Sequence, residues 1–311
     1  MTAEEVLDKL LQFKGIVGYA NNRDNNSKVI FVESYEIARA MPKVIAGEPV
    51  RVEVVGRIET LVDRKGRVRP LVGGISFGDL TVTAGTLGCV IDNTAVTNAH
   101  VIAIDWRNRK WNEVGVPVIQ PGPYDGGTAK DKVGVLKDYI KIELGEGKTN
   151  YADFACAEIQ VDKVSNAVLD RDDKNYFTVE GVAEVSKGDK LCKSGRTTGF
   201  TSAKVRYESA TVKVYGYFNR DSYAIFKDVI LTDAFAMGGD SGSLAFTPTG
   251  KAVGLVFAGS PFVTCVCKWK YFEHKIGKAK QDFKAVVLLG LPMLVGIALA
   301  KRKSEKSEKS K

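Results

Sequence analysis

The sequence predicts a mostly β protein, built as a barrel or a sandwich, with a small α+β region before it. Glycine turns separate several short, β-branched segments in the middle of the 311-residue chain, at 95–97, 114–119, 132–136, 139–144, 211–217 and 224–232. Many short strands at this spacing are typical of barrels and sandwiches. The hydrophobic content of 44% and the charged content of 26% are ordinary for a globular protein. The length allows a two-barrel core plus a small extra domain.

The first residues predict that small extra domain. Residues 1–13 have a capping Thr2, an acidic first turn and an apolar face, and therefore predict a helix. They lack the basic start and the continuous apolar core of a signal peptide. Further elements are expected as strands at 16–20, 28–33 and 51–58 and as a helix at 34–40 capped by Ser34. We interpret residues 1–68 as a small α+β accessory domain and 63–70 as its linker, an exposed loop and a candidate processing site.

An uncharged segment near the other end predicts a membrane anchor. Residues 285–300 carry no charge and are bounded by Lys284 and Lys301. A helix of this length spans ~24 Å of a ~30 Å hydrocarbon core, and flanking lysines can snorkel across the difference. The alternative is a buried helix packed on the barrel. Residues 301–311 form a basic, low-complexity tail that is expected to be disordered. Basic flanks on both sides leave the topology open.

Charge and cysteine content exclude other classes of protein. The net charge of +8 resides in residues 268–284 and 301–311, which each hold six Lys or Arg against two acids. The rest of the chain holds 33 basic and 33 acidic residues, so no nucleic-acid partner is expected. The five cysteines are dispersed and odd in number, which favours buried thiols over a disulfide framework. No metal site and no cofactor are predicted.

The most informative stretch is 237–244, which reads Met-Gly-Gly-Asp-Ser-Gly-Ser-Leu. A nucleophilic serine needs an exposed hydroxyl on a tight turn, with backbone N–H groups beside it for the oxyanion. Gly239 and Gly242 allow such a turn around Ser241. Alone, the same residues also fit an ordinary surface turn.

Candidate partners for Ser241 are few, because the chain has only two histidines. His100 follows the strand expected at 95–97, whereas His274 lies in a lysine-rich segment and is expected at the surface. Asp153 precedes an alternating strand of small residues. It is the best candidate for a carboxylate that is partly buried and holds the imidazole in one tautomer. An ordinary turn residue is the alternative for Asp153.

The order His100, Asp153, Ser241, with gaps of 53 and 88 residues, resembles the chymotrypsin/trypsin-like serine peptidases of the prokaryotic and viral branch. Five motifs in register carry the resemblance: Thr-Asn-Ala-His-Val at 97–101, Asp-Phe-Ala-Cys-Ala at 153–157, Lys-Ser-Gly-Arg-Thr-Thr-Gly-Phe-Thr at 193–201, Gly-Asp-Ser-Gly-Ser at 239–243 and Ala-Val-Gly-Leu-Val-Phe-Ala-Gly-Ser at 252–260. The resemblance implies a double six-stranded β-barrel as a peptidase domain over residues 69–275.

The same resemblance implies a function and a site. The expected function is a serine endopeptidase acting on polypeptides, with backbone N–H groups of Gly239 and Ser241 as the oxyanion hole. Phe235 would lie at the base of the substrate pocket, and its wall would include Phe257, Ala258 and Gly259. This pocket predicts uncharged, small or apolar residues at the cleavage site, although nearby Asp233 keeps Arg or Lys open.

Two other functions stay open at this stage. The chain could be a catalytically silent binding or scaffold protein, or it could be a hydrolase of esters. The sequence also departs from secreted family members, since no cysteine flanks His100 or Ser241 and no activation site is evident. The sequence therefore leaves open which group positions Asp240.

Overall fold

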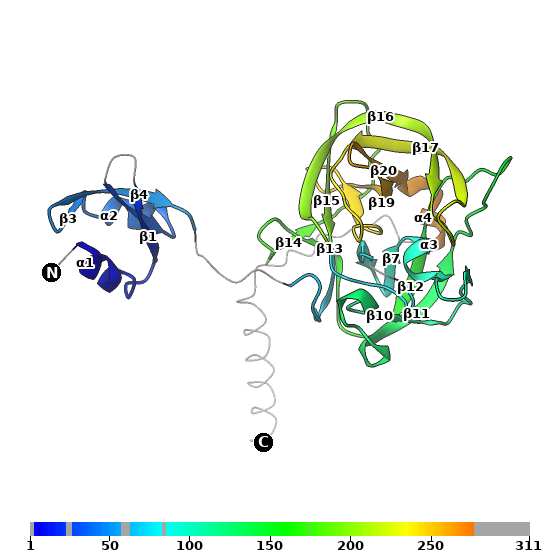
Figure 1. Ribbon diagram of the computed structural model, residues 1–311, viewed down its shortest axis with the longest axis horizontal. Coiled ribbons are helices and arrows are strands. Elements are labelled where there is room, and N and C mark those ends of the chain that lie inside the picture. The colour runs from blue at the N-terminus through cyan, green and yellow to red at the C-terminus, as the bar shows by residue number, and fades with distance from the viewer. Residues whose placement is uncertain (1–2, 23–26, 57–62, 83–84, 174, 277–311) are drawn as a thin grey trace, which may run out of the picture. The chain divides into compact units, whose positions relative to one another are not determined.

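The computed structural model describes residues 3–22, 27–56, 63–82, 85–173 and 175–276. The chain divides into two compact units, Met1–Leu61 and Val62–Lys311 (Figure 1). Strands dominate the second unit, so the predicted mostly β fold class is confirmed. Residues 285–311, which include the predicted membrane helix and tail, lie outside the described residues. No helix in the described ranges is long and apolar enough to cross a membrane.

The first unit is a four-stranded sheet with two helices. The sheet order is β1 (Ile16–Asn22), β2 (Ser27–Val32), β4 (Glu48–Val54) and β3 (Val44–Ile45), and only the β2–β4 pair is parallel. The helices are α1 (Ala3–Leu10) and α2 (Tyr35–Ala40). Ser34 caps α2 as predicted, since its Oγ accepts a hydrogen bond from Ile37 N. Leu7, Ile30 and Val32 form the centre of the core.

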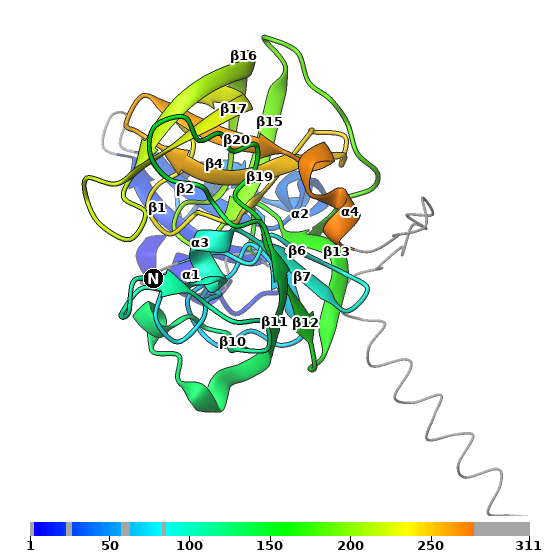
Figure 2. The same ribbon diagram turned by 90° about the vertical axis from the view of Figure 1, so that its right-hand side faces the viewer.

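The first half of the second unit is built around a five-stranded antiparallel sheet. Its order is β10 (Pro117–Ile119), β11 (Lys132–Tyr139), β12 (Ala155–Ile159), β7 (Thr94–Thr97) and β6 (Cys89–Ile91). An isolated bridge to Ile119 adds Gly78 at the edge of the sheet, beside β10. The helical turn α3 (Ala99–Ile102) follows β7 and lies between the two halves of this unit in both views (Figures 1 and 2).

Smaller elements complete this half. β5 (Leu71–Gly73), β13 (Lys163–Leu169) and β14 (Tyr176–Thr178) form a three-stranded sheet, and β8 (Ile104–Asp105) pairs with β9 (Lys110–Trp111). Two short 3₁₀ helices, η1 (Pro123–Asp125) and η2 (Ala129–Asp131), precede β11. Apolar side chains from both halves merge into one buried cluster, which fixes the halves against each other.

The second half is a closed six-stranded barrel. The strands run in the order β15 (Lys190–Gly195), β16 (Gly199–Tyr215), β17 (Tyr223–Asp233), β20 (Val263–Lys268), β19 (Ala252–Gly259) and β18 (Leu244–Phe246). Closure leaves no unpaired sheet edge in the barrel. The 3₁₀ helix η3 (Trp269–Tyr271) and α4 (Glu273–Ile276) follow β20.

Two local expectations differ from the structure. Residues 140–144 do not form the strand expected there, because the amide of Asn150 bonds the backbone N and O of Glu143 in place of a neighbouring strand. The segment 63–70 is not simply an exposed loop, since Arg64 is buried. Its guanidinium pairs with Asp173 and donates to Ser194 Oγ at 2.7 Å. This anchoring ties the start of the second unit to β15.

Candidate active site

His100 and Asp153 come together at the end of two neighbouring strands. His100 lies in α3 directly after β7, and Asp153 lies two residues before β12, which pairs with β7. His100 Nδ1–H donates to Asp153 Oδ2 at 2.6 Å, and His100 N donates to Asp153 Oδ1 at 3.2 Å. With its Nδ1 occupied, the neutral imidazole presents Nε2 as a proton acceptor.

Asp153 is fully buried rather than partly buried as expected, and a tyrosine that the sequence did not reveal stabilises it. Tyr217 OH donates to Asp153 Oδ2 at 2.9 Å. Tyr217 follows β16 in the second half and is itself buried, and its ring meets the His100 ring edge-on at 6.3 Å. Burial, reinforced by the Asp153 charge, raises the pKa of Tyr217 well above its usual value. The tyrosine therefore stays a hydrogen-bond donor.

Ser241 lies on the turn between β17 and β18, and this turn packs on the first half of the unit. Thr86 N donates to Ser241 O at 2.8 Å. Gly242 adopts a φ of +94° and approaches Thr97, the last residue of β7, so closely that a Cβ would collide with Thr97 Oγ1. Only glycine fits such a position. The serine turn is thus fixed against the strand that leads into His100.

Ser241 Oγ forms no hydrogen bond within the described residues, so its hydrogen bond to His100 is not formed in this structure. Two backbone N–H groups beside it, those of Gly239 and Ser241, also have no hydrogen-bond acceptor in the described ranges. Gly239 has a φ of +94°, a conformation that favours glycine. These two N–H groups can therefore donate hydrogen bonds to an oxygen of a bound ligand.

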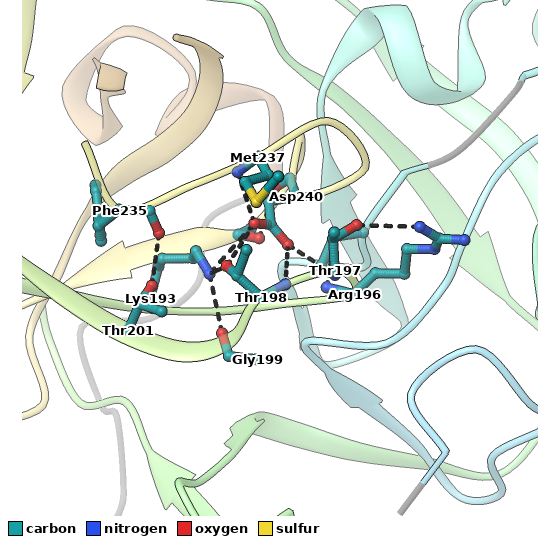
Figure 3. Close-up of polar contacts among 12 residues, drawn as sticks. Lys193, Arg196, Thr197, Thr198, Gly199, Thr201, Phe235, Met237 and Asp240 are labelled. Atoms are coloured by element: carbon teal, nitrogen blue, oxygen red, sulfur yellow. Dashed lines mark hydrogen bonds and ion pairs between the residues drawn. The ribbon is translucent and has the colours of Figure 1, made fainter. Parts of the chain in front are cut away.

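The carboxylate of Asp240, next to Ser241, is fully buried and surrounded by donors from the β15–β16 turn (Figure 3). It accepts from Thr197 N at 2.8 Å, Thr198 N at 3.1 Å and Thr198 Oγ1 at 2.6 Å, and also from Met237 N at 3.0 Å. Its ion-pair partner is Lys193, whose Nζ lies 3.5 Å away. The buried cation that positions Asp240, left open by the sequence, is therefore a lysine of the barrel itself.

Lys193 is an unusual group for a protein interior. Its side chain is fully buried, and Nζ also donates to Gly199 O at 2.9 Å and to Thr198 Oγ1. Burial lowers the pKa of Lys193 from 10.5 to about 8, although the Asp240 charge opposes this shift.

A groove with a volume of about 670 Å³ opens beside Ser241. Its lining is largely apolar and includes Phe235, Met237, Val256, Ala258 and Pro261. Thr198, Thr201 and Ser260 contribute hydroxyl groups, and none of the lining residues is charged.

Most of the residues predicted for the pocket line this groove, namely Phe235, Ala258 and Gly259. Phe257 does not. It is buried on the opposite face of β19, with its ring 4.7 Å from that of Phe226. Side chains alternate between the two faces of a strand, so Val256 and Ala258, the neighbours of Phe257, face the groove instead.

The remaining candidates lie outside the site. His274 is exposed on α4, and the five cysteines are buried free thiols. In the described ranges, no group of three His, Cys, Asp or Glu side chains could hold a metal ion. Asp233 pairs with Arg206 at 2.6 Å and does not line the groove.

The second unit, with its antiparallel five-stranded sheet and its closed six-stranded barrel, has a trypsin/chymotrypsin-like fold. Solved structures with this fold match the chain. They include the Nocardiopsis protease NAPase, with 19% identity, a TM-score of 0.47 and 65% of this chain and 95% of that chain covered. Chymotrypsin of Cellulomonas bogoriensis matches with 16% identity, a TM-score of 0.49 and 66% and 94% coverage.

A third match is protease A of Thermobifida fusca, with 18% identity, a TM-score of 0.47 and 66% and 95% coverage. Identities this low concern the fold alone and say nothing of activity. No protein-family model matches the sequence, and no curated protein matches it either.

Proposed function

We propose that the protein is a serine endopeptidase. The observation that carries the proposal is the buried Asp153 bonded to His100, in the unit where Ser241 borders a groove beside two unpaired N–H groups. A base, an orienting carboxylate, a serine and oxyanion donors are the parts that acyl transfer requires.

In the proposed reaction, Ser241 Oγ attacks the scissile carbonyl carbon and its proton moves to His100 Nε2. The carbonyl oxygen takes up the negative charge and accepts hydrogen bonds from Gly239 N and Ser241 N. The C–N bond then breaks, and His100 gives its proton to the leaving amine. Water repeats these steps on the acyl-enzyme, which releases the carboxylic acid and restores Ser241.

The hydrogen bond between Ser241 and His100 is expected to form in the substrate complex. Catalytic hydrogen bonds are often long or misaligned when no substrate is bound and tighten afterwards.

The groove supports a preference for uncharged, apolar or small residues at the cleavage site. An Arg or Lys side chain would need an acid in the groove, and Asp233, the nearest candidate in sequence, instead pairs with Arg206. Peptides that differ only in this residue (Ala, Leu, Phe, Arg and Glu) test the preference. Faster cleavage after Arg than after Leu would contradict it.

Fluorophosphonate labelling tests the proposed nucleophile. Wild-type protein should label, whereas Ser241→Ala and His100→Ala should not, because members of a triad act as a unit. Peptide cleavage should be lost in the same variants. Folded wild-type protein that does not label would indicate a silent binding protein, and cleavage of esters without peptides would indicate an ester hydrolase.

We also propose that residues 285–300 anchor the protein to a membrane, on the basis of their uncharged sequence between lysines. Fractionation of the full-length chain beside a variant that ends at Ile276 tests this. Full-length protein that stays in a detergent-free soluble extract would refute the anchor.

A further inference from the structure

Two threonines hold successive carbonyl oxygens of the turn that carries Ser241. Thr197 Oγ1–H donates to Gly238 O at 2.9 Å, and Thr86 Oγ1–H donates to Gly239 O at 2.7 Å. Thr197 belongs to the turn between β15 and β16, which Figure 3 shows beside Asp240. The Thr197 side chain takes no part in the bond-making and bond-breaking steps proposed for Ser241 and His100.

The bond to Gly238 O determines where Gly239 N–H points. In a trans peptide the C=O and the following N–H point in opposite directions. The Gly238–Gly239 peptide is trans, so a carbonyl directed at Thr197 leaves Gly239 N–H directed away from it. This N–H is one of the two proposed oxyanion donors.

The second donor is fixed in the same way by a different residue. Asp240 O accepts from Ser243 Oγ at 2.6 Å and from Ser243 N at 3.0 Å, which orients the N–H of Ser241. Each N–H of the proposed hole is thus set by a hydrogen bond to the carbonyl of its own peptide group.

The peptide between Gly238 and Gly239 needs such a restraint more than others. Glycine adopts both signs of φ readily, so a peptide between two glycines rotates at little steric cost. A Cβ at Gly238 would meet nothing within 4 Å. On the other side, a Cβ at Gly239 would lie 2.5 Å from Thr197 Oγ1, so the backbone approaches Thr197 closely.

Thr197 is itself anchored across the two halves of the unit. Arg196 Nη1–H donates to Thr197 Oγ1 at 3.0 Å. The other two nitrogens of the guanidinium, Nε and Nη2, donate to the two carboxylate oxygens of Asp125 in η1. The side chains of Arg196 and Asp125 are only 6% and 5% exposed, and the guanidinium lies over the Tyr124 ring. Because its oxygen accepts from Arg196, the single hydroxyl proton of Thr197 is available to Gly238 O.

We propose that Thr197 is a positioning residue of the oxyanion hole. Its hydroxyl selects the orientation of the Gly238–Gly239 peptide in which Gly239 N–H faces the substrate oxygen. Arg196 and Asp125 hold that hydroxyl in place. This inference rests on the proposed peptidase function.

The test compares Thr197→Val, Thr197→Ser and Thr197→Ala with wild type. Valine preserves the shape of threonine and removes the hydroxyl, and serine and alanine differ only by that hydroxyl. Exposed Thr211 on β16 offers the matched control Thr211→Val.

The valine and alanine variants should lose about 10-fold to 100-fold in kcat, short of the ~10²–10³-fold that removal of an oxyanion donor costs. KM should stay within about twofold of the wild-type value, because the loss of an interaction made only in the transition state lowers kcat and leaves KM unchanged. A peptide aldehyde forms an adduct with Ser241 whose oxygen lies in the proposed oxyanion hole. It should therefore bind the valine and alanine variants more weakly than wild type, by a factor similar to the loss in kcat. The serine and Thr211→Val variants should retain activity.

Several outcomes would overturn the inference. Wild-type kcat in Thr197→Val would do so, as would a change confined to KM or a serine variant as impaired as the alanine variant. If the valine variant fails to fold, the serine–alanine pair decides alone. Wild-type protein that does not label with fluorophosphonate would instead overturn the proposed function, so the two failures are distinguishable.

Discussion

Replacing Tyr217 with phenylalanine removes one oxygen from the surroundings of Asp153. The lost hydrogen bond measures 2.9 Å and joins two groups that are 4% and 0% exposed. Hydrogen bonds to charged groups contribute about 1.5–3 kcal/mol, and a factor of ten in rate corresponds to ~1.4 kcal/mol. We expect Tyr217→Phe to lose about 2 kcal/mol of unfolding free energy and about 10-fold in kcat/KM. The ring itself stays packed against Phe226.

The dependence of stability on pH reports on the same hydroxyl. In the wild type, the raised pKa of Tyr217 means that its contribution to stability is complete below about pH 10 and declines above it. Urea unfolding at a series of pH values measures this decline.

Tyr215→Phe serves as the control for this prediction, because Tyr215 lies on the same hairpin and is 60% exposed. It should behave as wild type in both assays. Unchanged kcat/KM and an unchanged unfolding midpoint in Tyr217→Phe would refute the assigned role of the hydroxyl.

Three further predictions concern buried charges. Lys193→Met leaves the Asp240 carboxylate without its cation and should cost about 3–5 kcal/mol in urea unfolding, and an unchanged midpoint would contradict this. Because burial lowers the pKa of Lys193 from 10.5 to about 8, the native state binds fewer protons than the unfolded state between these values. This group should therefore raise stability with pH in that window, by up to ~3 kcal/mol, and the rise should vanish in Lys193→Met. Arg64→Ala should destabilise the second unit and speed tryptic cleavage after the exposed Lys65, because the backbone there is no longer anchored; cleavage as slow as in wild type would count against the anchor.

The sequence predicted the elements whose signals are local. The segment before His100 contains β-branched residues, and the turn around Ser241 contains glycines, so each motif specifies its own backbone. The strand expected at 224–232 appears as β17, Tyr223–Asp233, for the same reason. Local composition therefore indicated where the candidate groups lie in the sequence, but not which of them come into contact in the fold.

Contacts between distant residues were not predictable in this way. Tyr217 meets Asp153 across 64 residues of sequence, and Thr197 meets Gly238 across 41. No local sequence pattern around Tyr217 or Thr197 indicates which distant residue it will contact. Phe257 shows a second limit, because the apolar sequence of β19 does not reveal which of its two alternating sets of side chains faces the groove.

The surroundings of Asp240 bear on whether the proposed oxyanion hole needs proteolytic activation. Four of its five polar partners come from β15 and the turn that follows it, namely the ion-pair partner Lys193 Nζ and the donors Thr197 N, Thr198 N and Thr198 Oγ1. This cation belongs to the barrel, so its pairing with Asp240 requires no new N-terminus. A buried carboxylate is stable only when it is paired and hydrogen-bonded, and here both conditions hold in the uncut chain. We therefore expect the intact protein to label with fluorophosphonate without prior proteolysis, and labelling that appears only after cleavage would show that Lys193 does not suffice.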